Sequence, residues 1–423
     1  MDERKVIYYI DNDERYMALF MRKIQIIALV FLILFINFAG SLKVNAEDEP
    51  AQLYSKSCAL MDGESGRVLF GKEEMEPRAN ASTTKILTCI VALENGELEG
   101  NVKVSSNAAG QPKVHLGMRK DEEFCLKDLL YGLMLESFND CAVAIAEHIS
   151  GTTEDFARLM NDKAKEIGCE ETYFITPNGL DAQDKNGIHH TTAKDLCRIM
   201  KYCCWESPKS EEFLHITETP SYSFQDTKGK SFSCSNHNAF LTMMDGVISG
   251  KTGFTGDAGY CYVAALERDG RKYCIALLAC GWPNNRTYKW SDAKKLLGYG
   301  LDAYQKKNIF QMPKLEDVIV RDGKRIGEGL ESWGKTVSIH PAADCTDKTE
   351  MYYLISENDQ TSVKLIMNSD ISAPIQEGTK IGRIQVILNN EIIKEYPVTA
   401  DEKLEKWTFM RLLRCILEEY LCQ

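Results

Sequence analysis

The chain has 423 residues, 44% of them hydrophobic, which is enough for two or more domains with sizeable apolar cores. Its formal net charge is −12, from 62 acidic and 50 basic residues. No field of Lys and Arg of the kind that nucleic-acid-binding proteins carry is present, so we expect no nucleic-acid partner.

Residues 1–46 consist of a polar N-terminal overhang, which is unusual for a signal peptide, followed from Met21 by the three-part pattern of a secretory signal peptide. A basic start at Met21-Arg22-Lys23 precedes an unbroken apolar run over 26–36, and Val44-Asn45-Ala46 offers small residues for cleavage. A membrane-spanning anchor is the alternative, but this run is short against the roughly 20 residues that a spanning helix needs. We expect an exported, extracytoplasmic protein, secreted or peripherally attached to the outer face of the membrane. Translation starts at Met1 or Met21.

Residues 47–305 mix strand and helix patterns and predict one domain. A hairpin is expected over 57–70, and further strands over 247–279, where Asp269-Gly270 marks a tight turn. Thr192 and Asp195 have the spacing of a capping box at a helix start. Helices are expected over 83–94, 126–135, 140–149, 153–167, 192–201 and 291–304.

The pattern changes near residue 306. Residues 306–400 contain short alternating strands, such as VKLIM and RIQVIL, and predict a small all-β domain. Residues 401–423 place apolar side chains such as Trp407 and Leu412 among charged ones, which is typical of an amphipathic helix from about Lys403. This helix either attaches to a membrane surface or packs on its own domain.

Fifteen cysteines in an exported chain suggest disulfides, but the number is odd and several cysteines lie inside apolar runs. There a cysteine behaves as a small hydrophobic residue, so we expect free thiols. Vicinal Cys203-Cys204 lacks a His or Cys partner at a ligand spacing. We therefore expect no metal and no cofactor.

A Ser-x-x-Lys pattern places a hydroxyl and an amine on one face of a helix. Serine needs a nearby base to become a nucleophile, and a buried lysine can serve because desolvation disfavours its charged form. The pattern occurs three times, at Ser82/Lys85, Ser291/Lys294 and Ser332/Lys335. Only the first opens a helix that continues as a nearly pure apolar run, so it is the candidate.

Two further motifs follow Ser82. Ser137-Phe138-Asn139 interrupts two apolar helices, and such a polar loop can present a hydroxyl and an amide to a cleft. Lys251-Thr252-Gly253 occurs once, in a strand pattern, where it can pair with an extended peptide and meet its carboxylate. This trio is the known motif set of penicillin-binding proteins and class A β-lactamases.

With these motifs the sequence resembles the low-molecular-weight D-alanyl-D-alanine carboxypeptidases, serine peptidases of family S11. The resemblance extends to the lead-in Arg78–Ser82, to Pro177-Asn178-Gly179-Leu180 and to the segment from Ala373 to Gly382. It implies an α/β (α+β) transpeptidase-like domain, with an antiparallel sheet packed against a helical subdomain, followed by a small all-β domain. The implied partners are peptidoglycan stem peptides ending in D-Ala-D-Ala and β-lactam antibiotics.

The resemblance also implies the catalytic roles. Ser82 attacks the peptide carbonyl and becomes an acyl ester, Lys85 accepts its proton, and Ser137 relays a proton to the leaving D-alanine. The residues implied to bind substrate or the oxyanion are Asn139, Lys251, Thr252, Gly253, Phe254 and Arg286.

The sequence departs from the family pattern at two positions. Phe138 replaces a usual glycine, and Cys141 replaces a usual alanine. We expect Phe138 to narrow the cleft or alter substrate preference without removing a reacting group.

Three alternatives stay open. A class A β-lactamase needs a glutamate that drives deacylation, and no Glu-x-x-Leu-Asn sequence occurs over 166–189. Endopeptidase action on cross-links by the same site is a second alternative. A catalytically silent wall-binding protein is the third, although every reacting group of the motifs is present.

Overall fold

The computed structural model describes residues 49–50, 52–343, 345 and 350–421. The predicted signal peptide and overhang, residues 1–46, lie outside the described residues, as do the last two residues of the predicted C-terminal helix.

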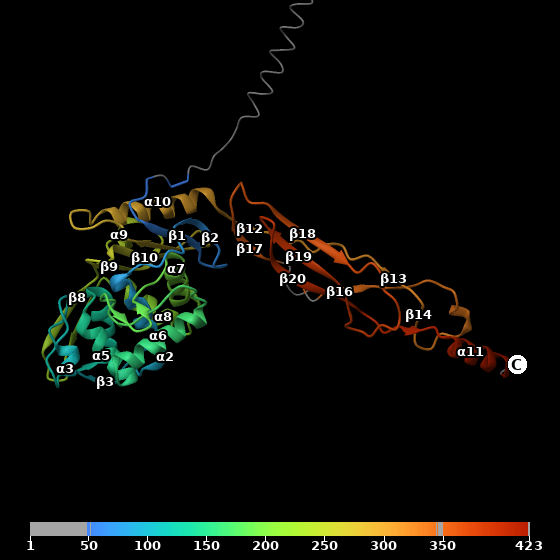
Figure 1. Cartoon of the computed structure of the whole chain (residues 1–423), viewed down its shortest axis with the longest axis horizontal. Coiled ribbons are helices and arrows are strands. Elements are labelled where there is room, and N and C mark those ends of the chain that lie inside the picture. The colour runs from blue at the N-terminus through green and yellow to red at the C-terminus, as the bar shows by residue number, and fades with distance from the viewer. Residues whose placement is uncertain (1–48, 51, 344, 346–349, 422–423) are drawn as a thin grey trace, which may run out of the picture. The chain divides into compact units, whose positions relative to one another are not determined.

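A five-stranded antiparallel sheet forms the centre of the first domain (Figure 1). Its spatial order is β2 (Val68–Lys72), β1 (Ser57–Asp62), β11 (Arg271–Leu278), β10 (Gly259–Arg268) and β9 (Val247–Thr255). The predicted hairpin over 57–70 and the predicted strands over 247–279 are confirmed. Strand β9 lies at an edge, so one side of its backbone is unpaired within this sheet.

Both faces of the sheet are covered, because alternate side chains of a strand point to opposite sides. In β10, Val263 and Ala265 pack into the core shared with the helical subdomain. Tyr262 and Leu266 pack into a second core with α10 (Tyr288–Ala303).

The helical subdomain is built around α2 (Lys85–Asn95). The residues from Ile86 to Leu93 are all buried, as expected for a helix that is apolar on every side. The predicted helix over 126–135 is α4 (Leu126–Tyr131) followed by a π-helical turn over Gly132–Glu136. The other helices are α3 (Ser106–Ala109), α5 (Asn139–Ser150), α6 (Thr153–Ile167), α7 (Ala193–Lys201), α8 (Ser210–Glu218) and α9 (Phe240–Met243).

This domain also contains short two-stranded ladders. They are β3 (Asn101–Lys103) with β4 (Glu123–Cys125), β5 (Gln183–Asp184) with β6 (Gly187–Ile188), and β7 (Ser221–Gln225) with β8 (Ser231–Ser235).

The second domain contains a four-stranded antiparallel sheet with its own core. The spatial order is β16 (Pro341–Ala343), β20 (Glu391–Ala400), β19 (Lys380–Leu388) and β18 (Thr361–Met367). Further ladders pair β12 (Gln305–Asn308) with β17 (Tyr352–Ile355), β13 (Val318–Val320) with β15 (Val337–Ile339), and β14 (Gly323–Lys324) with β21 (Glu405–Lys406).

The C-terminal helix α11 spans Phe409–Leu421, so the predicted start near Lys403 is wrong. Residues 405–406 pair with β14, and the Trp407 N–H donates to the Asp322 carbonyl at 2.9 Å. These backbone bonds hold the segment extended until residue 408. Within the part of the chain that the structure describes, no helix combines the length and apolar character needed to cross a bilayer.

The described cysteines are all free thiols. Cys89, Cys274 and Cys280 are fully buried in the apolar cores, which fits their expected behaviour as small hydrophobic residues. Burial raises the pKa of the Cys261 thiol to about 12, so this thiol stays protonated near neutral pH.

Candidate active site

Ser82 lies in a 3₁₀ turn, Ala81–Thr84, that leads directly into α2. The turn is pinned from within, since the Asn80 amide donates to Thr84 Oγ1 at 2.9 Å and Thr83 Oγ1 donates to the Asn80 carbonyl at 2.6 Å. Ala81 has a left-handed φ of 49°, an unfavourable conformation for a residue with a Cβ. The surrounding contacts therefore hold Ser82 in a turn that it would not adopt alone.

Lys85 connects the first two motifs. Its Nζ donates to Ser82 Oγ at 2.8 Å and to Asn139 Oδ1 at 2.8 Å. Its side chain is fully buried, and this burial, reinforced by the positive charge of Lys251, holds its pKa well below the ordinary value. A neutral Lys85 amine can accept a proton from the Ser82 hydroxyl, so the arrangement suits base-assisted nucleophilic attack.

Ser137 ends the π-helical turn in a left-handed conformation, with φ 66° and ψ 32°. The Phe138 N–H donates to the Gly132 carbonyl at 3.2 Å, which closes the turn before α5 begins. The Ser137 hydroxyl oxygen is buried and has no hydrogen-bond partner among the described residues. A buried hydroxyl without a partner is costly, so this group suits a partner that arrives with substrate.

The Phe138 ring packs on the residue that starts the π-helical turn. A Cβ built on Gly132 would lie 3.1 Å from the Phe138 ring and 3.1 Å from Cys141 Sγ. Phe138 also contacts the helical core. Gly132 thus makes room for both departures from the family pattern, Phe138 and Cys141, while Asn139 keeps its contact with Lys85.

The third motif lies on the edge strand β9, next to Ser82. A Cβ built on Gly253 would lie 2.9 Å from the Ser82 backbone nitrogen, so only glycine lets the strand approach this closely. Lys251 is buried, which lowers its pKa to about 7, and its Nζ donates to the Thr252 carbonyl at 3.0 Å. The structure therefore brings the three predicted motifs together around the Ser82 turn.

Phe254 and Arg286, the remaining predicted site residues, are both exposed, and only Phe254 lies on the strand that carries the third motif. Phe254 follows Gly253 on β9, with its side chain exposed and its ring 4.7 Å from that of Tyr260. Arg286 is exposed just before α10 and, within the described residues, makes no side-chain hydrogen bond to the motifs. Its carbonyl accepts from the buried Lys289 at 2.6 Å. A role for Arg286 in carboxylate binding stays a prediction.

Comparisons with known proteins agree with this geometry. Residues 43–279 match the family model of the D-alanyl-D-alanine carboxypeptidases, peptidase S11, and residues 335–406 match the C-terminal domain of penicillin-binding protein 5. The chain belongs to the D-alanyl-D-alanine carboxypeptidase family. It is accordingly a serine-type carboxypeptidase, and the predicted fold class is confirmed.

Individual relatives support the same assignment. The D-alanyl-D-alanine carboxypeptidase DacF of Bacillus subtilis (strain 168) is 29% identical over 367 residues, covering 85% of this chain and 88% of that protein. A carboxypeptidase structure from Mycobacterium tuberculosis H37Rv is 29% identical, with a TM-score of 0.55, and covers 61% of this chain and 94% of that one. Penicillin-binding protein 5 of Haemophilus influenzae, at 24% identity, shares the fold over 85% of this chain and 99% of its own, with a TM-score of 0.64.

In this carboxypeptidase the loop from Pro177 to Leu180 packs against the Ser82 turn. The spacing of the motifs did not indicate this structural role. Gly179 has φ +79°, and a Cβ built there would lie 2.0 Å from the Ala81 carbonyl oxygen. Thr88 Oγ1 donates to the Pro177 carbonyl at 2.6 Å, which ties the same loop to α2. The loop therefore presses directly against the peptide that precedes the nucleophile.

His189 is a second support that sequence reasoning missed. Its Nε2 lies 3.0 Å from Thr84 Oγ1, and its Nδ1 accepts from the Ile175 N–H at 3.1 Å. Burial lowers the pKa of His189 to about 3, so the ring stays neutral and serves as a fixed hydrogen-bonding group. A histidine within an unremarkable loop sequence carries no spacing signal of its own.

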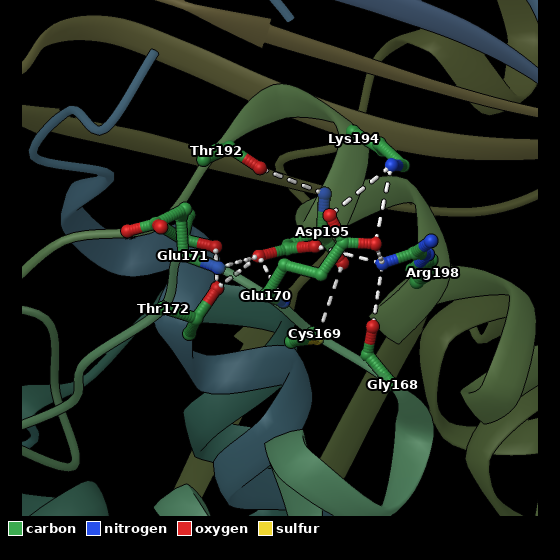
Figure 2. A network of polar contacts seen from close by, with 10 residues as sticks. Gly168, Cys169, Glu170, Glu171, Thr172, Thr192, Lys194, Asp195 and Arg198 are labelled. Carbon is green, nitrogen blue, oxygen red and sulfur yellow. Dashed lines mark hydrogen bonds and ion pairs between the residues drawn. The ribbon is translucent and has the colours of Figure 1, made fainter. Parts of the chain in front are cut away.

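A buried carboxylate holds the start of this loop region in place (Figure 2). Asp195 accepts hydrogen bonds from the Glu170 and Glu171 N–H groups, at 3.0 and 2.9 Å, and from Thr172 Oγ1 at 2.9 Å. The capping box is half confirmed, because Thr192 Oγ1 does accept from the Asp195 N–H at 3.0 Å. The Asp195 carboxylate, however, serves the loop instead of the helix start.

Proposed function

We propose that this enzyme removes the terminal D-alanine from peptidoglycan pentapeptide stems through an acyl-enzyme on Ser82. The observation that carries the proposal is the position of the buried Lys85 amine, which is 2.8 Å from both the Ser82 hydroxyl and the Asn139 amide oxygen. The nucleophile, its base and an amide from the second motif thus form one connected group.

The chemistry follows from these contacts. As Ser82 Oγ forms a bond to the carbonyl between the two D-alanines, its proton passes to the Lys85 amine, whose charged form is disfavoured by burial. The C–N bond then breaks, and the leaving amine takes a proton relayed from Lys85 through the Ser137 hydroxyl. Water hydrolyses the ester, which releases the shortened stem and regenerates Ser82.

Substrate binding uses the edge strand and the second motif. Lys251 and Thr252 hold the terminal carboxylate, Asn139 orients the acyl amide, and Gly253 allows the peptide to lie close to the strand. The Ser82 and Phe254 N–H groups stabilise the oxyanion, and losing one such donor raises a barrier by about 3 to 4 kcal/mol. Arg286 is a further candidate contact for the carboxylate.

Mass spectrometry of the penicillin-treated protein tests the nucleophile. We expect one covalent adduct on Ser82, and D-alanine release from a synthetic pentapeptide that disappears in Ser82→Ala and Lys85→Ala. Ser291→Ala is a matched control, because Ser291 stands in the same Ser-x-x-Lys spacing but is exposed on α10. An adduct on any other residue, or full activity in Ser82→Ala, contradicts the proposal.

The same experiment separates the alternatives. The loop from Pro177 to Leu180, which packs on the Ser82 turn, carries no acidic side chain, and this favours a long-lived acyl-enzyme over rapid β-lactam turnover. Fast penicillin hydrolysis without a lasting adduct would indicate a β-lactamase. Absent labelling would indicate a silent wall-binding protein, and cleavage of cross-linked dimers would add endopeptidase activity.

The proposed reaction has a consequence for the cell wall. Removing the terminal D-alanine limits cross-linking during cell-wall synthesis.

We also propose that α11 attaches the exported enzyme peripherally to the outer face of the cell membrane. None of its side chains is buried against the described chain, and Phe409, Met410 and Tyr420 are each at least 70% exposed. Exposed apolar side chains on a helix with charged residues suit an interfacial position in a bilayer. Loss of vesicle binding on deletion of residues 409–423 is the expected result, and unchanged binding refutes this attachment.

A further inference from the structure

Ile319, Trp333 and Trp407, hereafter the tip cluster, form an apolar surface on the second domain. Ile319 is 62% exposed and Trp333 is 51% exposed. The rings of Trp333 and Trp407 meet edge to face, with centroids 5.4 Å apart at 90°. All three residues line one open cavity of about 410 Å³. Large apolar side chains gathered at one surface site mark an interaction surface more often than a solvated one.

The exposure of Ile319 follows from its place in β13. Its neighbour Val320 points into the core of the domain and is only 2% exposed, so the strand alternation directs Ile319 outward. A polar residue is the usual choice at such a position. Ile319 pairs with Ser338 on β15, so the small side chain opposite it leaves it uncovered.

The tip cluster is continuous with the start of α11. Trp407 precedes the helix by two residues, and its backbone bond to Asp322 fixes it beside the turn between β13 and β14. In Figure 1, β13, β14 and α11 occupy the same end of the second domain. The helix α11 therefore begins beside the tip cluster, and it contacts the turn Leu330–Ser332 that precedes Trp333.

We propose that the tip cluster enters the interfacial region of a lipid bilayer beside α11, which gives the second domain two membrane contacts. This inference rests on the proposed membrane attachment through α11. Tryptophan is favoured at the membrane interface because its ring is apolar and its N–H is polar. Ile319 favours lipid over a sugar ligand, since an aliphatic side chain stacks on no ring and accepts no hydrogen bond.

A nearby cation fits phospholipid head groups. Lys335 lines the same cavity and is exposed, whereas Lys324 is buried, with its Nζ 4.7 Å from the centre of the Trp407 ring. Long basic side chains of this kind bury their stems in apolar surroundings and keep the charge at the interface. A helix joined through residue 408 alone would leave the domain free to turn, whereas a second contact fixes its orientation relative to the membrane.

Vesicle binding of residues 47–423, which include the whole compact unit from Gln52 onward, tests the inference. The vesicles contain equal parts of phosphatidylglycerol and phosphatidylethanolamine. We expect the double variant Ile319→Ser/Trp333→Ser to bind roughly tenfold or more weakly, because two large apolar side chains no longer leave water. Ile392→Ser is the matched control, since Ile392 is 55% exposed on β20 of the same domain but belongs to neither the cavity nor α11.

A second readout uses the unmodified protein and one conservative variant, which keeps an aromatic ring at position 333. Vesicles with brominated acyl chains should quench the intrinsic tryptophan fluorescence, and the conservative variant Trp333→Phe should lose a measurable part of that quenching. Equal vesicle affinity of the double variant, or undiminished quenching in Trp333→Phe, overturns the inference. The inference is also overturned if vesicles do not quench the fluorescence and the protein instead binds peptide-free glycan strands in a way that Trp333→Phe abolishes. That result would assign the cavity to a sugar ligand.

The outcomes distinguish this inference from the proposals on which it rests. If deletion of 409–423 abolishes binding while the double variant binds normally, α11 anchors alone and only the tip inference fails. If the intact protein does not bind vesicles, both membrane proposals fail. Release of D-alanine from a soluble pentapeptide should be equal in the double variant and in the unmodified protein, because the tip cluster is outside the catalytic machinery.

Discussion

Replacing Gly179 by alanine offers a sharp test of how the Ser82 turn is held. Gly179 has φ +79°, where a residue with a Cβ is strained by about 1 to 2 kcal/mol. The new Cβ would also lie 2.0 Å from the Ala81 carbonyl oxygen, whereas real Cβ atoms essentially never approach closer than 3.0 Å. The carbonyl or the loop must therefore move by about 1 Å, and overpacking of this kind costs about 1 to 3 kcal/mol.

The consequence for catalysis follows from the neighbouring residue. Ala81 precedes Ser82, whose hydroxyl is 2.8 Å from the Lys85 amine, and a displacement of about 1 Å in a reacting group can reduce a rate by about 100-fold. We expect Gly179→Ala to slow acylation of Ser82 by a fluorescent penicillin by about that factor. Urea unfolding should show a loss of roughly 2 to 5 kcal/mol in the free energy of unfolding.

The control variant Gly151→Ala separates the effect of left-handed backbone strain from the effect of displacing the Ser82 turn. Gly151 has φ +81° at the end of α5, and a Cβ built there meets nothing within 4 Å. This control should lose only the left-handed strain of about 1 to 2 kcal/mol and acylate at the normal rate. The reasoning is refuted if Gly179→Ala acylates normally and is no less stable than Gly151→Ala.

Two further predictions concern pH and stability. Because burial lowers the pKa of Lys251 to about 7, this lysine loses its charge as pH rises through that value. The uncharged amine binds the substrate carboxylate less well, so kcat/KM, which reports ionisations of the free enzyme, should decline above about pH 7. Lys251→Arg should remove that alkaline decline, since arginine stays charged, and a decline retained in this variant would assign it to another group. Asp195→Ala should reduce the free energy of unfolding by about 3 kcal/mol, because it removes the acceptor of three loop donors, the Glu170 N–H, the Glu171 N–H and the Thr172 hydroxyl. A urea midpoint within error of the unmodified protein would show that the loop is held by other contacts.

Local spacing predicted the parts of the site that lie close together in the chain. Ser82 and Lys85 share a helix face at positions i and i+3, and the break at Ser137-Phe138-Asn139 does separate two helical segments. The capping residue Thr192 was predictable for the same reason. The predicted helix start near Lys403 was wrong because pairing of Glu405–Lys406 with β14 is a contact across about 80 residues of sequence, which local periodicity does not register.

Sequence alone determined the reacting groups and their family, since these depend on residue types at short fixed spacings. Only the tertiary structure decided the properties that make those groups reactive. The low pKa of Lys85 arises from complete burial beside Lys251, and the close approach of Gly253 to Ser82 arises from the way the edge strand packs on the turn. Desolvation and contact depend on every neighbour in space, including His189 and Gly179, and neighbours in space come from segments that the chain order keeps far apart.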